Sequence, residues 1–542
     1  MENYLLSDVI FNVLKYLDKN DSFSFLNTCK NTLLNKPILY KKYVYIITKI
    51  PKHILDDSNN LSNLSNLSNL NSVKKIRIFD FDELNKFAFN NLKLIIMKNE
   101  RVEQLSFSNL CNLTCLTHLL INCESFNSPL DNLPQTITKL IIKSNKFNQQ
   151  FNNLPLNLKY LKIDCARYNF PLNNLPNSLL NLIIYSNAYN YDLDNLPVNL
   201  KQLQLQCNNC IHPLNNLPPD LINLKIYNLF FNNTLDNLPK KLESLIIGVA
   251  EFNQPINNLP NTLKFLTISS PKFNRPIDNL PNNLCELKIM SQIFNESTDN
   301  LPNDLYNFEI ISIIFNRSLD NLPTNLKKIF INSDNFNQSL SKLPDTLTEL
   351  VIGSDKFNQS LKKLPTDLKK LEIICDCFNK SVNKINNYSK NLIKLYVGSY
   401  LFNKSLDNLP NNLLNITIHS TNFDQSIDNL PKTIISLKIC SRKFNQTLDN
   451  LPSTIQYLII GSGNTLKSGE FNKPINYLPL SLKELLISSN KFNQSLNSLP
   501  YNLDALVINS KCFKQSLSNL PSSLKLIKLN TKTFRNANYK EI

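Results

Sequence analysis

A unit of 21 residues recurs along most of the sequence. One copy begins at Phe315 and reads Phe-Asn-Arg-Ser-Leu-Asp-Asn-Leu-Pro-Thr-Asn-Leu-Lys-Lys-Ile-Phe-Ile-Asn-Ser-Asp-Asn, and Phe336 begins the next. The step is 21 residues almost everywhere, but it is 24 between Phe378 and Phe402 and 27 between Phe444 and Phe471. The position that opens each copy is Phe in most copies and Tyr or Cys in a few. It first occurs at residue 126 and last at residue 534. A fixed period of this length predicts a solenoid of about twenty coils.

Each copy carries one β-strand signal. After the Pro comes Leu-x-x-Leu-x-Ile, for example Leu347, Leu350 and Ile352. Its alternating end predicts a short strand with Leu and Ile on one face, and stacked copies would pair as a parallel sheet. The Leu-Pro before it, as in Leu259-Pro260 and Leu322-Pro323, is incompatible with a helix interior, so every coil is expected to turn there.

The Phe-Asn pair that opens each copy predicts two further stacks. The Phe side chains, such as Phe252 and Phe315, are expected to form an aromatic spine opposite the sheet. The Asn side chains that follow, such as Asn253 and Asn316, are expected to form a ladder of amides. The two longer steps place their extra residues beside the strand end, near residues 386–391 and 462–468.

One residue per strand, between the inward Leu and Ile, is predicted to face outward. These residues mix aliphatic and aromatic side chains with charges, where a strand facing only water would be polar. This mixture favours a partner-binding face, although generic β-propensity also accounts for Ile and Val there. The residues singled out for this face are Lys162, Lys225, Lys288, Phe330, Val351 and Tyr396.

The chain divides into five predicted segments. Residues 1–45 lie outside the repeat, and their apolar residues recur at helical spacing, which predicts a small helical module. Residues 46–72 contain a low-complexity Leu-Ser-Asn stretch and are predicted to be a linker. Residues 73–125 are expected to be degenerate entry repeats, 126–533 the solenoid and 534–542 the C-terminal end.

Composition limits the kinds of protein the chain can be. The net charge is +16, but the lysines are spread along the array, which indicates compositional bias more than nucleic-acid binding. The twelve cysteines are scattered, so a disulfide framework is not expected. Neither a secretory leader nor a membrane-spanning apolar stretch is apparent. We therefore expect a soluble, cytoplasmic protein that binds neither a membrane nor a cofactor.

Catalytic and metal-binding motifs are weak. The four histidines are His53, His118, His212 and His419, and none belongs to a recognisable motif. Cys207-x-x-Cys210 with His212 resembles a metal site, but Cys210 occupies the repeat's Phe position and Cys207 a position held elsewhere by Ser. A small buried side chain explains Cys207, so we expect neither a metal site nor an enzyme.

Two resemblances to known families follow from these residues. The stretches Phe252-Asn253-Gln254-Pro255-Ile256 and Phe471-Asn472-Lys473-Pro474-Ile475 resemble the FNIP repeat, a leucine-rich-repeat-like unit. The N-terminal segment resembles an F-box, the helical module that docks on the Skp1 adaptor of cullin-type ubiquitin ligases. The resemblance implies Skp1 contacts through its apolar residues, namely Leu5, Val9, Ile10, Val13, Leu14, Leu17 and Phe25.

Together the resemblances imply a fold and a function. The fold is a leucine-rich-repeat-like parallel β-solenoid preceded by an F-box-like module, as in proteins of amoeba-infecting giant viruses and social amoebae. The implied function is a non-enzymatic substrate receptor that joins Skp1 and a cullin to a target, a host protein in host cytoplasm if the chain is viral. Two alternatives stay open: a scaffold whose N-terminal helices only cap the solenoid, and a basic binder of nucleic acid or anionic surfaces.

Overall fold

The protein is described by a computed structural model that covers residues 45–46, 75–78, 92–98, 110, 113–461, 469–530 and 532–535. The chain forms two compact units. The first comprises Met1–Tyr168 and Asn174–Leu179, and the second comprises Asn169–Asn173 and Leu180–Ile542. In each unit the described strands pair in parallel with the strand of the next coil, apart from the last one.

The first unit contains strands that pair in chain order, each parallel to the one before it. The register of β4 against β5 matches residues 21 apart, such as Leu119 with Leu140. The strands are β1 (Tyr45–Ile46), β2 (Lys75–Ile78), β3 (Leu94–Lys98), β4 (His118–Asn122), β5 (Lys139–Lys143) and β6 (Tyr160–Asp164).

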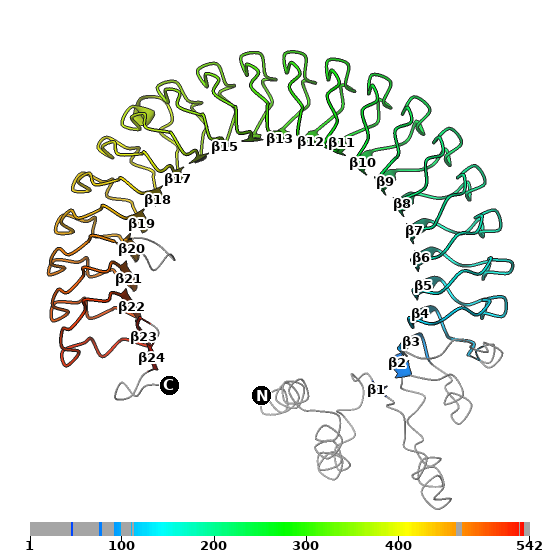
Figure 1. The fold of residues 1–542 in the computed structure, drawn as a ribbon, viewed down its shortest axis with the longest axis horizontal. Helices are drawn as coiled ribbons and strands as arrows, with labels where there is room; N and C mark the ends of the chain where they lie inside the picture. Colours follow the sequence, from blue (N-terminus) through cyan, green and yellow to red (C-terminus); the bar gives the residue numbers. More distant parts are fainter. Residues whose placement is uncertain are drawn as a thin grey trace, which may run out of the picture. The chain divides into compact units, whose positions relative to one another are not determined.

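The second unit holds the longer series, and Figure 1 shows its strands along the inner side of the row of coils. The strands are β7 (Asn181–Tyr185), β8 (Gln202–Gln206), β9 (Asn223–Asn228), β10 (Ser244–Val249), β11 (Phe265–Ser269), β12 (Glu286–Met290), β13 (Asn307–Ile311), β14 (Lys328–Asn332), β15 (Glu349–Gly353), β16 (Lys370–Ile374), β17 (Lys394–Gly398), β18 (Asn415–Ser420), β19 (Ser436–Ser441), β20 (Tyr457–Gly461), β21 (Glu484–Ser488), β22 (Ala505–Asn509), β23 (Leu526–Leu529) and β24 (Lys532–Arg535).

The core runs through the inside of the coils. In β14 the alternating residues Ile329 and Ile331 are buried, and Leu326 just before the strand is fully buried. Each large side chain removed from water in this way stabilises its coil by about 1.5–3 kcal/mol. Because equivalent positions are buried in neighbouring described coils, the core of each unit is a column of contacts between neighbours. The predicted leucine-rich-repeat-like parallel solenoid of about twenty coils is confirmed.

An aromatic spine runs from coil to coil, as predicted. Phe315 and Phe336 are both fully buried, and their rings stack with centroids 6.0 Å apart and planes 6° from parallel. From Phe231 to Phe513 the consecutive ring pairs have centroid distances of 5.9 to 6.3 Å. Offset stacking of this kind adds to the burial of each ring.

The Asn that follows each spine aromatic forms the predicted ladder in a specific way. The backbone N–H of Asn358 donates to Asn337 Oδ1 at 3.0 Å, and Gln359 Nε2 donates to the same oxygen, also at 3.0 Å. The side-chain oxygen therefore accepts two bonds from the next coil. Asp424 takes this place in one coil and accepts from the N–H of Asn445 at 2.9 Å, because only an acceptor is needed.

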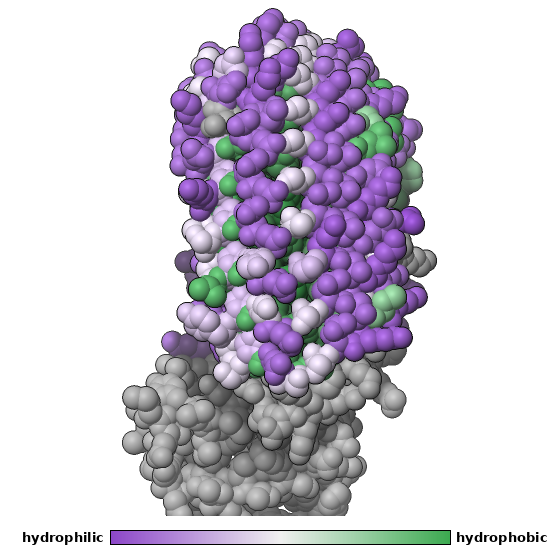
Figure 2. Space-filling model, turned by 90° about the vertical axis from the view of Figure 1, so that its left-hand side faces the viewer, coloured by the Kyte–Doolittle hydropathy of each residue, from purple (hydrophilic) through white to green (hydrophobic). Residues whose placement is uncertain are grey.

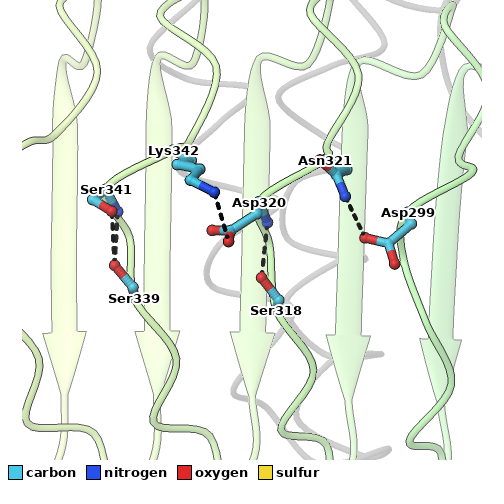
Figure 3. A network of polar contacts seen from close by, with 7 residues as sticks. All are labelled: Asp299, Ser318, Asp320, Asn321, Ser339, Ser341 and Lys342. Atoms are coloured by element: carbon cyan, nitrogen blue, oxygen red, sulfur yellow. Dashed lines mark hydrogen bonds and ion pairs between the residues drawn. The ribbon is translucent and has the colours of Figure 1, made fainter.

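A second set of polar contacts lies in the turn before the Leu-Pro pair, and Figure 3 shows part of it. Asn321 Nδ2 donates to Asp299 Oδ1 of the preceding coil at 3.0 Å. Within a coil, the N–H of Asp320 donates to Ser318 Oγ at 3.1 Å, which closes the turn. The hydrogen bond from Ser297, followed by that from Asn321, lowers the pKa of Asp299. These contacts satisfy the turn and join one coil to the next.

The two longer steps and the end of the array were also predicted from the sequence. The extra residues of the 24-residue step fall in the predicted range, 386–391, but they lie in the turn before β17, which begins with the 3₁₀ helix η5 (Ile385–Asn387), because a turn absorbs added length without breaking the sheet. Residues 462–468 lie outside the described part. Phe534 lies in the predicted C-terminal end and belongs to β24, which pairs antiparallel with β23 and covers that strand's free edge.

Most of residues 1–72 also lies outside the described part of the chain. The predicted F-box-like helices and the Leu-Ser-Asn linker belong to this region, and only β1 of it is described. Among the described residues there is no helix of the length and apolarity that a membrane span requires.

Candidate functional site

The strand side of the second unit, which we call the inner face, contains more outward-facing residues than the sequence predicts. Each five-residue strand turns its second and fourth residues inward, so its first, third and fifth residues lie on the inner face; in β14 these are Lys328, Phe330 and Asn332. The residue between Leu and Ile does face outward, as predicted, and the first and fifth residues of the strand share its face. The sequence signal that would have found them is the alternation of inward and outward residues along the whole strand, not only between Leu and Ile.

The centre of the inner face is apolar. Phe330 of β14 and Val351 of β15 are direct neighbours in the sheet. Phe330 is half-buried, whereas only 8% of Val351 is exposed, although both side chains point away from the core. Val351 is the smaller side chain, and it is flanked by Phe330 and Glu372 in the adjacent strands. The expectation of an exposed Val351 is corrected accordingly.

Ion pairs border this apolar centre. Lys288 Nζ lies 2.7 Å from Glu309 Oε1, and Lys328 Nζ lies 2.8 Å from Glu349 Oε1, each pair bridging adjacent strands. On the other side Lys394 Nζ lies 2.7 Å from Glu372. These lysines and glutamates neutralise one another in pairs. Half-exposed pairs contribute at most about 1 kcal/mol each, so their main effect is to cancel charge on this face.

Glu372 is the most perturbed of these carboxylates. Burial opposes its ionisation, but the hydrogen bond from Lys394 and the nearby charge of Lys370 outweigh burial and lower its pKa. Lys370 Nζ lies 3.5 Å from the same oxygen that Lys394 contacts. Glu372 is thus held ionised between two lysines.

Two glycines shape the same region. A Cβ on Gly353 would come within 2.6 Å of Asn332 Oδ1, so the Asn332 side chain lies over this glycine. A Cβ on Gly398 would come within 2.9 Å of the Tyr396 ring. Because glycine has no side chain, the Asn332 side chain can lie over Gly353 and the Tyr396 ring over Gly398.

The remaining predicted face residues lie apart from this centre. Lys225 is the third residue of β9, and Tyr396 is the third residue of β17. Lys162 is the middle residue of β6 in the first unit, 3.4 Å from Asp164. Of the six predicted residues, the structure brings Phe330 and Val351 into direct contact in the sheet and places Lys288 two strands from Phe330.

The predicted repeat residues line the inside and the turns of their coils. Phe252 and Phe315 are spine aromatics, and Asn253 and Asn316 each accept the N–H of the next ladder residue. Leu259 and Leu322 are buried. The carbonyl oxygens of the following prolines close the turn before the strand by accepting the N–H three residues on, from Leu263 to Pro260 and from Leu326 to Pro323.

The cysteines and histidines form no chemical site in the described part of the chain. Cys207 and Cys210 are buried, and Asn228 Nδ2 donates to the Cys210 carbonyl at 2.8 Å. His212 Nε2 lies 3.2 Å from the Asn190 carbonyl oxygen. Among the described residues no three His, Cys, Asp or Glu side chains are grouped to hold a metal. Burial raises the pKa of Cys165 and of Cys375 to about 12, so these thiols stay protonated.

The residues predicted to contact Skp1 lie outside the described residues, namely Leu5, Val9, Ile10, Val13, Leu14, Leu17 and Phe25. Figure 2 shows the outer side of the coils from one direction, where it is largely hydrophilic, with polar columns running along the stack and apolar residues between them.

Comparison with known proteins agrees with this architecture. The FNIP repeat family model matches residues 423–463. The crystal structure of CroV588, described as a novel circular LRR protein structure, is 26% identical, covers 89% of this chain and 85% of its own, and has a TM-score of 0.60. The structure of a TLR13–ssRNA13 complex is 14% identical, covers 81% of this chain and 78% of its own, and has a TM-score of 0.51, which supports the fold alone.

A third structure has a lower TM-score. YopM from Yersinia enterocolitica WA-314 is 20% identical over 72% of this chain and 90% of its own, with a TM-score of 0.44. No curated protein sequence matches the chain. The described coils and their parallel register show a leucine-rich-repeat-like parallel solenoid, and residues 423–463 of it are similar to the FNIP repeat.

Proposed function

We propose that this protein is a non-enzymatic adaptor whose inner sheet face holds a partner protein. The observation that supports it most directly is the apolar pair Phe330 and Val351, bordered by the ion pairs Lys288–Glu309 and Lys328–Glu349. An apolar centre with a polar border is the usual anatomy of a protein interface. Leucine-rich-repeat solenoids offer such faces as extended binding surfaces.

The ion pairs favour a protein over a nucleic acid as the partner of this face. A phosphate backbone is held by cations that release counterions, and here the lysines already contact carboxylates. A nucleic acid would have to break Lys328–Glu349 and Lys394–Glu372 and then face unpaired carboxylates. An apolar protein surface can cover Phe330 and leave these pairs in place at the rim.

We further propose that residues 1–45 act as an F-box and join the solenoid to Skp1 and a cullin. This step rests on the sequence resemblance and on the apolar spacing of Val9, Val13, Leu14 and Leu17. The inner face would then select the target for ubiquitination, a host protein in the cytoplasm if the chain is viral. Without Skp1 binding, the protein would be an interaction scaffold.

The Skp1 proposal is tested with purified Skp1 and the full chain by isothermal titration calorimetry. Leu14→Asp should abolish binding, because it places a charge on the predicted apolar helix face. Lys15→Asp changes charge one residue further on, off that face, and should bind like the parent protein. Equal binding by all three proteins, or by none, would overturn the F-box assignment and leave the scaffold.

The inner-face proposal is tested by proximity labelling of partners in amoeba cells. Phe330→Glu should remove the labelled target, because a carboxylate in the apolar centre would be buried unpaired under a partner. Asn325→Glu adds the same charge in the turn before β14 and should leave labelling unchanged. A target that persists with Phe330→Glu, in a variant whose circular dichroism and melting temperature match the parent, would show that it binds elsewhere.

A further inference from the structure

A second surface lies beside the inner face, where the chain leaves each strand. Two residues separate the buried Ser or Cys after a strand from the next spine aromatic, and we call this pair the exit loop; examples are Ile313–Ile314 and Asp334–Asn335. Successive exit loops lie close together, since Ser333 Oγ is 3.3 Å from the Ile313 carbonyl oxygen of the preceding coil. The corresponding distance from Ser354 to Asp334 is also 3.3 Å.

Two apolar clusters lie along the series of exit loops. In the first, Ile293, Ile313 and Ile314 are 43%, 47% and 38% exposed, and they occupy adjacent coils. In the second, Tyr400 and Leu401 are 61% and 48% exposed. Ile374, the last residue of the adjoining β16, is 49% exposed and belongs to this second cluster. Large apolar side chains gathered in this way on a soluble surface indicate a binding site.

The exit loops between the two clusters carry exposed carboxylates. Asp334, Asp355 and Asp376 occupy the same loop position in three consecutive coils, and all three are exposed. Among the described residues none of these carboxylates takes part in an ion pair. The nearest loop lysine, Lys356, instead donates from Nζ to Asn335 Oδ1 at 2.6 Å. This differs from the inner face, where the carboxylates of Glu309, Glu349 and Glu372 are paired.

We propose that the exit loops from Ile293 to Leu401 form a second docking surface, for a basic segment of a partner protein with apolar side chains at both ends. The apolar ends would cover the two clusters, and the cationic middle would meet the carboxylates of Asp334, Asp355 and Asp376. Five steps between coils at about 4.8 Å span roughly 24 Å. A helix of about 16 residues has this length.

The negative charge of the exit-loop carboxylates argues against two other occupants of this surface. A second copy of this chain that used the same surface would bring two rows of carboxylates together, and like charges facing each other in an interface are unfavourable. A nucleic acid would be repelled by the same carboxylates. A basic protein segment is the class that satisfies the apolar and the acidic parts together.

The experiment uses the full-length protein and two fluorescent 16-residue helical peptides, followed by fluorescence anisotropy. One peptide has leucines at both ends and three lysines in the middle, and the other has glutamates in place of the lysines. The lysine peptide should bind and the glutamate peptide should not. The double variant Asp355→Asn/Asp376→Asn should weaken binding about two- to thirtyfold, as expected for two exposed ion pairs.

Two further variants complete the test. Asp304→Asn/Asp367→Asn removes two exposed charges from the turns before the strands and should bind like the parent protein. Ile313→Ser/Ile314→Ser should weaken binding at least tenfold without lowering the melting temperature, because both side chains are exposed. Equal binding of the two peptides, binding of neither, or equal affinity of the two aspartate variants would overturn the proposal. So would concentration-dependent dimerisation that Asp355→Asn/Asp376→Asn strengthens.

Discussion

The hydroxyl of Ser333 donates a hydrogen bond to the carbonyl oxygen of Phe315, 2.8 Å away, inside one coil. The same bond recurs in other coils, for example from Ser312 to Phe294 and from Ser354 to Phe336, both at 2.8 Å. It satisfies the carbonyl next to the spine aromatic, which is buried and out of reach of water. One small polar side chain thus ties the end of each strand to the spine.

Ser333→Ala should therefore destabilise the solenoid by about 1–3 kcal/mol, because it leaves the buried Phe315 carbonyl without its donor. Ser333→Cys should cost less, since Cys375 fills the equivalent place and its Sγ donates to the Phe357 carbonyl at 2.9 Å. Urea denaturation followed by circular dichroism measures both. An alanine variant as stable as the parent, or less destabilised than the cysteine variant, would contradict this account.

The aromatic spine predicts a larger effect. Phe336→Ala should destabilise the protein by about 3–5 kcal/mol, because it opens a cavity between Phe315 and Phe357 that these stacked rings cannot fill. Phe330→Ala removes the same side chain from the half-buried inner face and should cost less than half as much. Comparison of the two denaturation midpoints is the measurement, and a greater loss for Phe330→Ala would show that the spine is not the main support.

The Asn ladder needs an acceptor and not an amide. Asn337→Ala should cost about 1 kcal/mol, because the N–H of Asn358 and the Gln359 amide lose their shared acceptor. Asn337→Asp should cost less, as Asp424 shows by accepting from Asn445 and Gln446 of the next coil. Thermal unfolding of the three proteins at neutral pH distinguishes these outcomes. Equal loss in both variants would mean that the amide donor matters.

The lowered pKa of Glu372 makes stability depend on pH with a definite sign. A carboxyl whose pKa is lower in the folded than in the unfolded chain stabilises the fold above its ordinary pKa, 4.5, and this contribution disappears as the pH falls through the lowered value. Melting temperatures should thus fall as the pH is taken from 6 to 3, and the fall should be smaller for Glu372→Gln. Lys394→Met should reduce the slope as well, because Lys394 is a main cause of the shift. A slope that neither variant changes would assign the acid sensitivity to other groups.

Much of the coil could be derived from the sequence because its determinants are local. Leu-x-x-Leu-x-Ile, Leu-Pro and Phe-Asn predicted the strand, the turn, the spine and the ladder, since each depends on residues within one 21-residue unit. The pairing of Phe330 with Val351 also followed, because a strict period places equivalent residues side by side. Where the period lengthens, the sequence located the added residues near 386–391, but it did not predict the 3₁₀ helix η5 (Ile385–Asn387) that begins this turn. The antiparallel pairing of β24 with β23 was not predicted either.

The sequence by itself determined which side chains form the core of the coils, because these positions repeat with the period. Only the tertiary structure decided how exposed residues 21 positions apart act on one another. It paired Lys328 with Glu349, it covered Val351 with its larger neighbours, and it aligned Asp334, Asp355 and Asp376 between two apolar clusters. Exposed positions vary freely between copies, so no periodic pattern marks them. Their chemistry arises from contacts between coils, which exist only once the strands are in register.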